Sequence, residues 1–127
     1  MKSKKSLISA FLILGALALA ASVMAKESKA MEYRGDIIDS MCLGAHQDPA
    51  ALKEFVPTHT KECVLKPGCQ ESGMNLYQED GTVLKFDKAS DKKIISFLEK
   101  KDSKLQVIVT AKKKADNTYS LVSIKNQ

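Results

Sequence analysis

The stretch HTKECVLKPGC, residues 59–69, is the feature around which the rest of the chain is organised. It contains Cys63 and Cys69, and it opens with His59. The third and last cysteine, Cys42, lies upstream at the end of a strand-like run. Thiols and imidazoles are ligands for soft and borderline metal ions, and thiols also carry redox chemistry. We therefore expect the remaining sequence to build a scaffold that holds this cluster.

The residues around the cluster carry the start and stop signals of two short helices. Asp48-Pro49 places an acceptor side chain at a cap position before a proline at the first helical position, which predicts a helix start. Thr58 predicts the start of a second helix, and Pro67-Gly68 predicts its end. On that second helix, His59 and Cys63 are four residues apart and share a face.

Strand-like segments flank this helical insert. Asp80-Gly81 is a strong hairpin turn signal between two of them. The apolar stripe of residues 90–100 recurs at helical spacing. The expected strands are residues 33–41, 74–79, 82–87, 105–111 and 118–124. This order predicts a mainly β fold: a five-stranded OB-like barrel with a helix between strands three and four and a helical Cys/His insert between strands one and two.

The N-terminus has the pattern of an export signal. Lysines precede a nearly uninterrupted apolar run over residues 7–23, and the small-residue ending Val23-Met24-Ala25 resembles a cleavage site. We expect residues 1–25 to be a signal peptide, residues 26–32 a flexible leader and residues 33–127 the OB-like domain. The mature protein is then periplasmic or secreted, with no membrane association after cleavage.

Charge and composition narrow the class of partner. Removal of the three lysines in residues 1–25 lowers the formal net charge from +5 to +2, and the charges that remain are of both signs. The chain has three tyrosines, four phenylalanines and no tryptophan, so it offers few platforms on which bases can stack. We expect no nucleic-acid partner; a metal ion or a small ligand is the expected partner.

The first interpretation of the cluster is a metal site. Cys42, His59, Cys63 and Cys69 form a set of three thiolates and one imidazole, which suits tetrahedral zinc or copper(I). His46, four residues after Cys42, is a competing ligand. The sequence contains no C-x-x-C-H motif, so covalent c-type haem is not supported. On this interpretation the protein is non-enzymatic and no residue is assigned a catalytic role.

Two other interpretations use the same thiols. Exported cysteines commonly form disulfides, and one bridge from Cys42 to Cys63 or Cys69 would staple the insert to the sheet, adding about 2–4 kcal/mol. Because the cysteine count is odd, one thiol would then stay free. Alternatively, His59 would favour the Cys63 thiolate in a redox protein, with Cys69 as its resolving partner. Dedicated thiol oxidoreductases usually carry a C-x-x-C motif, and this sequence has none.

The order of these motifs resembles that of a group of small exported bacterial OB-like proteins of largely unknown function. The shared pattern is Gly-x-Ile-x-Asp-x-x-Cys, then His-Thr-x-x-Cys, then a second Cys and a Ser-Gly pair. The matching residues here are Gly35, Ile37, Asp39, Cys42, His59, Thr60, Cys63, Cys69, Ser72 and Gly73, followed by Leu121–Ile124 near the end. The resemblance covers most of residues 33–125. It implies an OB-like fold and an export route, without an established activity.

Overall fold

The computed structural model describes residues 28–127. The expected signal peptide lies outside these residues, as does the first part of the expected leader. No helix within residues 28–127 has the length and apolar character needed to cross a membrane.

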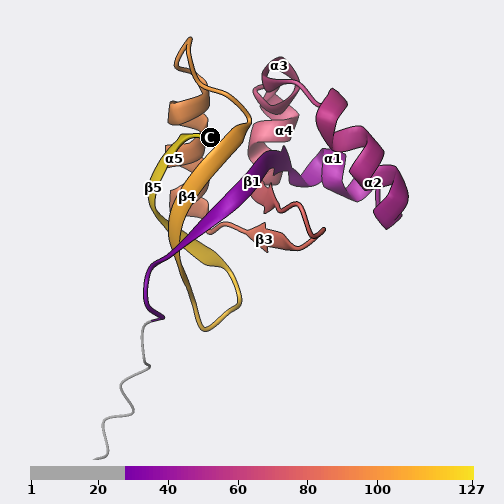
Figure 1. Ribbon diagram of the computed structural model, residues 1–127. Helices are drawn as coiled ribbons and strands as arrows, with labels where there is room; N and C mark the ends of the chain where they lie inside the picture. The colour runs from indigo at the N-terminus through magenta and orange to yellow at the C-terminus, as the bar shows by residue number, and fades with distance from the viewer. Residues whose placement is uncertain (1–27) are drawn as a thin grey trace, which may run out of the picture.

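The centre of the fold is one sheet of five antiparallel strands in the order β3-β2-β1-β4-β5 (Figure 1). The strands are β1 Met31–Asp39, β2 Met74–Tyr77, β3 Val83–Lys85, β4 Gln106–Lys113 and β5 Tyr119–Asn126. This confirms the predicted mainly β fold with five antiparallel strands. The sheet is not closed: between its edges only an isolated parallel bridge, Phe86 with Tyr119, is formed among the described residues. A complete barrel is therefore not confirmed.

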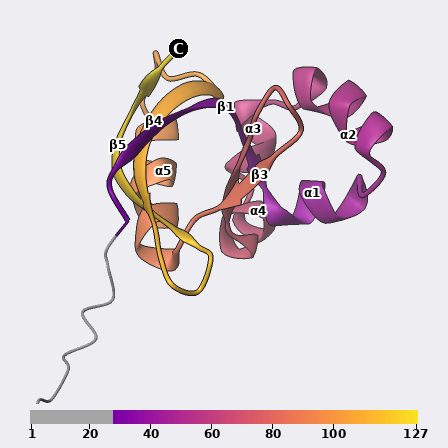
Figure 2. The ribbon, with the colours of Figure 1, turned by 60° about the horizontal axis from the view of Figure 1, so that its bottom comes forward.

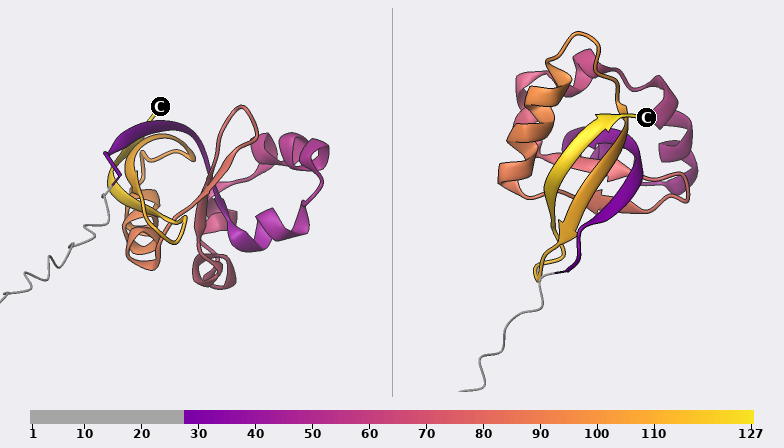
Figure 3. Two further views of the ribbon diagram at one scale, coloured as in Figure 1. Left: turned by 90° about the horizontal axis from the view of Figure 1, so that it is seen from below. Right: turned by 60° about the vertical axis from the view of Figure 1, so that its left-hand side comes forward.

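The first strand is shared between two neighbours. Its residues 31–36 pair with β4, and its residues 36–39 pair with β2. Gly35 lies at this changeover, where a Cβ atom would be 2.2 Å from the carbonyl oxygen of Tyr77. Only glycine allows the two backbones to approach this closely. The curvature of β1 across the sheet is visible in Figure 3.

The main core lies between the sheet and helix α5, Lys88–Leu98. Asp87 caps α5 by accepting a hydrogen bond from the Ser90 backbone, and Ile94 and Leu98 are fully buried. The core members are Ile37, Val64, Met74, Leu76, Leu84, Phe86, Ile94, Leu98, Leu105, Val107, Val109, Ala111 and Leu121. Helix α5 connects β3 to β4, as the order of the sequence segments predicts.

The first part of the helical insert, residues 40–55, lies on the far side of the molecule from α5 (Figures 1 and 2), whereas Val64 of the insert joins the main core. The insert connects β1 to β2, which confirms its predicted place. A second apolar cluster of Ile38, Leu52, Val56 and Tyr77 fastens it to the sheet. The insert consists of α1 Ser40–Ala45, α2 Pro49–Phe55, the 3-10 turn η1 Val56–Thr58, α3 Lys61–Val64 and α4 Pro67–Ser72.

The first strand has different bounds from those predicted. It begins at Met31 and so includes the last two residues of the expected leader. It ends at Asp39, because the Asp39 side chain accepts a hydrogen bond from the Cys42 backbone and starts α1 there. Cys42 therefore lies in a helix and not at the end of a strand.

The predicted second helix of the insert is wrong in both its start and its end. Thr60, not Thr58, caps the helix that contains Cys63, and His59 is extended at φ −68° and ψ 136°. His59 and Cys63 therefore do not share a helix face. Pro67 begins α4 and does not end a helix, because proline suits the first helical position and keeps the preceding Lys66 extended.

Gly35→Ala is expected to destabilise the protein by about 1–3 kcal/mol or more, because the added methyl group would overlap the backbone of Tyr77. Gly44→Ala is the matched control: Gly44 lies in α1, with no atom within 4 Å of an added Cβ, and alanine there is expected to be neutral or slightly stabilising. Urea unfolding of both variants measures the difference. Equal stability of the two would contradict this account of Gly35.

Candidate metal centre

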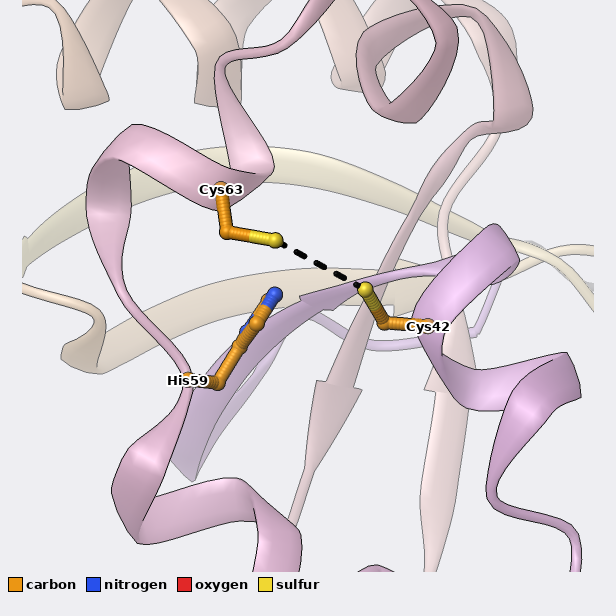
Figure 4. Close-up of side chains that lie close together, drawn as sticks. All are labelled: Cys42, His59 and Cys63. Atoms are coloured by element: carbon orange, nitrogen blue, oxygen red, sulfur yellow. Dashed lines mark hydrogen bonds between the residues drawn. The ribbon is translucent and has the colours of Figure 1, made fainter.

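Short helices with side-chain caps place the two half-buried thiols. The Oδ2 atom of Asp39 accepts a hydrogen bond from the Cys42 backbone nitrogen at 2.9 Å, at the start of α1. The Oγ1 atom of Thr60 accepts one from the Cys63 backbone nitrogen at 3.2 Å, at the start of α3. His59 stands in the extended link directly before Thr60. Three separate segments therefore bring their side chains to one place (Figure 4).

Polar contacts hold these segments against the sheet and α5. The Nζ atom of Lys61 donates to the carbonyl oxygens of Lys100 at 3.0 Å and Ser103 at 2.9 Å, which ties α3 to the turn after α5. The Nδ2 atom of Asn75 donates to the Ile38 carbonyl at 3.2 Å and to the Ser40 hydroxyl at 3.0 Å. The start of α1 is thereby fixed to β2.

The sulfur atoms are close but not bonded. The Sγ atoms of Cys42 and Cys63 are 3.9 Å apart, whereas a disulfide has an S–S length of about 2.05 Å. Among the described residues, which include every cysteine of the chain, no disulfide is formed. The ring of His59 points toward both sulfur atoms (Figure 4). Donor atoms of Cys42, His59 and Cys63 all lie within 4.8 Å of one another.

A second group overlaps the first. Donor atoms of Asp39, Cys42 and Cys69 also lie within 4.8 Å of one another. Cys42 belongs to both groups, and Cys69 comes from α4, where its side chain is buried. The predicted residues Cys42, His59, Cys63 and Cys69 thus belong to two overlapping groups, each close enough to hold a metal ion, with Cys42 in both.

The cluster contains a buried polar pair with incomplete hydrogen bonding. His59 Nε2 and Asp39 Oδ1 are 3.2 Å apart, and their side chains are 2% and 0% exposed. Although this distance is short, the geometry satisfies no hydrogen bond between them. Within residues 28–127, these are the two buried side-chain atoms that have no hydrogen-bond partner. Because Asp39 Oδ2 caps α1 while Oδ1 lacks a partner, the buried carboxylate is only half compensated, and this position favours a cation.

The protein environment shifts the pKa values of the cluster. Burial lowers the pKa of His59, and the neighbouring Asp39 carboxylate only partly opposes this effect. Burial, followed by repulsion from Asp39, raises the pKa of the Cys42 thiol to about 12. The same two causes, in the same order, raise the pKa of Cys69. Near neutral pH, Cys42 and Cys69 are therefore thiols, and a bound cation must displace their protons to gain thiolate ligands.

The competing ligand His46 has a different environment. Its Nδ1 atom lies 2.9 Å from the carbonyl oxygen of Cys42, and its ring stacks on Phe55 with the ring centres 3.8 Å apart. Neither group of donor atoms found among the described residues includes His46. A spacing of four residues in a helix brings the His46 ring to the Cys42 carbonyl. In the sequence, the same spacing suggested that His46 and Cys42 are two ligands of one ion.

Asp39 was not predicted as a donor. In the sequence, Asp39 falls within the strand expected over residues 33–41, whereas in the structure its side chain caps α1. The sequence signal that could have identified Asp39 as a donor was the apolar pair Ile37-Ile38 before it. This pair places the Asp39 carboxylate at the end of a buried strand.

Comparisons of the chain with protein-family models, with curated proteins and with solved structures found no match.

Alkylation of Cys42 in the reduced, metal-free protein is expected to be slow at neutral pH. Because its pKa is raised to about 12, the reactive thiolate is scarce, and its fraction increases tenfold with each pH unit below that value. Iodoacetamide labelling followed by peptide mass spectrometry measures the rate at Cys42 in the native and urea-unfolded chain. Equal rates in the two states would contradict the shift.

Proposed function

We propose that this chain is an exported, non-enzymatic protein that binds one metal ion, zinc or copper(I), at Cys42, His59 and Cys63 with Cys69 beside them. The observation that carries the proposal is the coincidence of two features at one buried point. The thiols converge there, and so do the partnerless atoms His59 Nε2 and Asp39 Oδ1. A cation would satisfy those atoms and balance the buried carboxylate.

The spacing of the sulfur atoms supports a four-coordinate ion. With zinc–sulfur bonds of about 2.3 Å and tetrahedral angles, two thiolate ligands lie about 3.8 Å apart. The Sγ atoms of Cys42 and Cys63 are separated by 3.9 Å. The thiolates also suit copper(I), which prefers soft sulfur ligands.

The export route and the family resemblance belong to the same proposal. The apolar N-terminal run and its small-residue ending support a signal peptide over residues 1–25 and a periplasmic or secreted location. Two observations support an OB-like barrel: the strand order, and the bridge from Phe86 to Tyr119 between the sheet edges. The motif from Gly35 to Cys69 supports kinship with the small exported OB-like proteins.

A disulfide staple is the second candidate function. The contact between the Cys42 and Cys63 sulfur atoms, which are 3.9 Å apart, favours it. Oxidation would then join α1 to α3 and leave Cys69 as a buried free thiol. A thiol redox function would instead use Cys63 with Cys69 as its resolving partner, and repeated opening and closing of the disulfide would distinguish it from a permanent staple.

The mature protein, purified from its exported location without chelator, is expected to have the mass of the reduced chain plus one metal ion. Cys63→Ser and His59→Gln are each expected to abolish stoichiometric retention because they remove a ligand. His46→Gln is the matched control and is expected to retain the ion, because His46 belongs to neither donor group. Native mass spectrometry reads all four samples. A metal-free chain two hydrogens lighter would overturn the metal proposal and support the staple.

Zinc affinity is expected to weaken on acidification. The Cys42 thiol, with its pKa of about 12, holds its proton throughout the neutral range and must release it to bind metal. The dissociation constant should therefore rise by at least about tenfold for each unit of pH lost between about pH 8 and pH 6. Competition titration with a chromogenic zinc chelator measures this slope. An affinity independent of pH would contradict thiolate ligation by Cys42.

A further inference from the structure

The buried carboxylate of Asp39 has one oxygen atom without a structural role. Its Oδ2 atom caps α1, whereas Oδ1 is buried, has no hydrogen-bond partner and lies at the imidazole edge of the cluster. We propose that Asp39 Oδ1, and not Cys69, is the fourth ligand of the metal ion, and that this carboxylate makes the site selective for a divalent ion over copper(I). This inference rests on the proposed metal-binding function.

The distance between Asp39 and His59 fits two ligands of one ion. Zinc–nitrogen and zinc–oxygen bonds of about 2.0–2.2 Å at a tetrahedral angle place the two ligand atoms about 3.4 Å apart. The observed separation of Nε2 and Oδ1 is 3.2 Å. The Cys42–Cys63 sulfur distance of 3.9 Å is likewise that of two ligands of one ion. Binding by all four residues would draw these two pairs together, because no group of mutually close donor atoms found among the described residues contains all four.

The relative orientation of Asp39 and His59 supports the same conclusion. At 3.2 Å, an imidazole and a carboxylate usually share a hydrogen bond, yet the geometry here satisfies none. Two ligand atoms of one ion lie at such a distance without a hydrogen bond between them, because the metal ion takes the place of the shared proton. The pair is almost completely excluded from solvent, so water does not readily replace the missing partner.

Charge decides which ion this donor set suits. The thiolates of Cys42 and Cys63 and the carboxylate of Asp39 carry three negative charges in a largely buried site. A divalent ion leaves one net negative charge, whereas copper(I) leaves two, and buried net charge is unfavourable. The oxygen donor also suits zinc better than copper(I), which prefers sulfur. The four residues therefore favour zinc, a divalent ion, over copper(I).

Cys69 is the competing fourth ligand, and its position makes it the poorer candidate. It is buried in α4 and shares a donor group with Asp39 and Cys42. The donor group that contains His59 and Cys63 includes neither Cys69 nor Asp39. Asp39 is the better placed of the two, because its Oδ1 atom already lies 3.2 Å from His59 Nε2, whereas Cys69 shares no donor group with His59.

The first test compares Asp39→Asn with the wild type in the full mature chain. Asparagine has nearly the same shape and is as good a helix cap, so the fold is expected to persist. Zinc affinity should fall by at least tenfold, while copper(I) affinity, measured with a colorimetric copper(I) chelator, should change by less than about threefold. Asp48→Asn is the matched control: Asp48 caps α2 in the same way at an exposed position and should leave both affinities unchanged.

The second test counts thiolates. Cobalt(II) in place of zinc gives a sulfur-to-metal charge-transfer band whose intensity scales with the number of thiolate ligands. Cys69→Ser should retain this intensity and the tetrahedral cobalt spectrum if Asp39 is the fourth ligand. The intensity should fall by about one third if Cys69 is a ligand, since three thiolates become two.

The outcomes separate the inference from the function on which it rests. If the wild type binds none of zinc, cobalt and copper(I), the metal-binding proposal fails. If it binds copper(I) alone, the metal site stands and the inference about Asp39 and selectivity is overturned. If the wild type binds zinc, but Cys69→Ser loses a third of the band or Asp39→Asn keeps its zinc affinity, the metal site stands and Asp39 is not its fourth ligand. If Asp39→Asn weakens zinc and copper(I) equally, the selectivity is overturned. Thermal unfolding of the metal-free variants checks that each is folded.

Discussion

The buried carboxylate of Asp39 is the constraint on which the rest of the site depends. One oxygen ends β1 and starts α1 by accepting the Cys42 backbone hydrogen bond, and the other lies 3.2 Å from the His59 ring. A carboxylate that is fully buried must be compensated by hydrogen bonds or by positive charge. The helix cap compensates one oxygen only. The imidazole of His59 lies beside the other oxygen, and the thiols of Cys42 and Cys69 belong to the same donor group as this carboxylate. One side chain therefore both caps the helix and contributes to the site.

The position of the cluster depends on strand β1 of the sheet. Successive residues of β1 face opposite sides, so Ile37 enters the main core, Ile38 enters the apolar cluster under the insert, and Asp39 follows at the edge of the site. Gly35 sets the direction of this strand where it leaves β4 for β2. A ligand that binds the native cluster but not the unfolded chain would therefore stabilise both apolar clusters together.

The elements that were predicted incorrectly lie mainly in the insert, because the local signals there are ambiguous. Proline is compatible both with the end of a helix and with its first position, and neighbouring threonines are both competent caps. The choice of Thr60 over Thr58, and of Pro67 as a start, depends on which arrangement lets Lys61 reach the turn after α5 and Cys69 pack inside α4. Those contacts join residues far apart in the chain, so local pattern does not contain them.

By itself, the sequence determined the element types that depend on local periodicity: the five strands, the hairpin at Asp80-Gly81, helix α5 and the position of the insert. It also identified the thiols and His59 by residue type. Only the tertiary structure decided which donors meet, separating His46 from the cluster and adding Asp39 to it. The physical reason is that alternation and capping act within a few residues. The distance between side chains on β1, the link at His59 and α3 is set by packing across the whole domain.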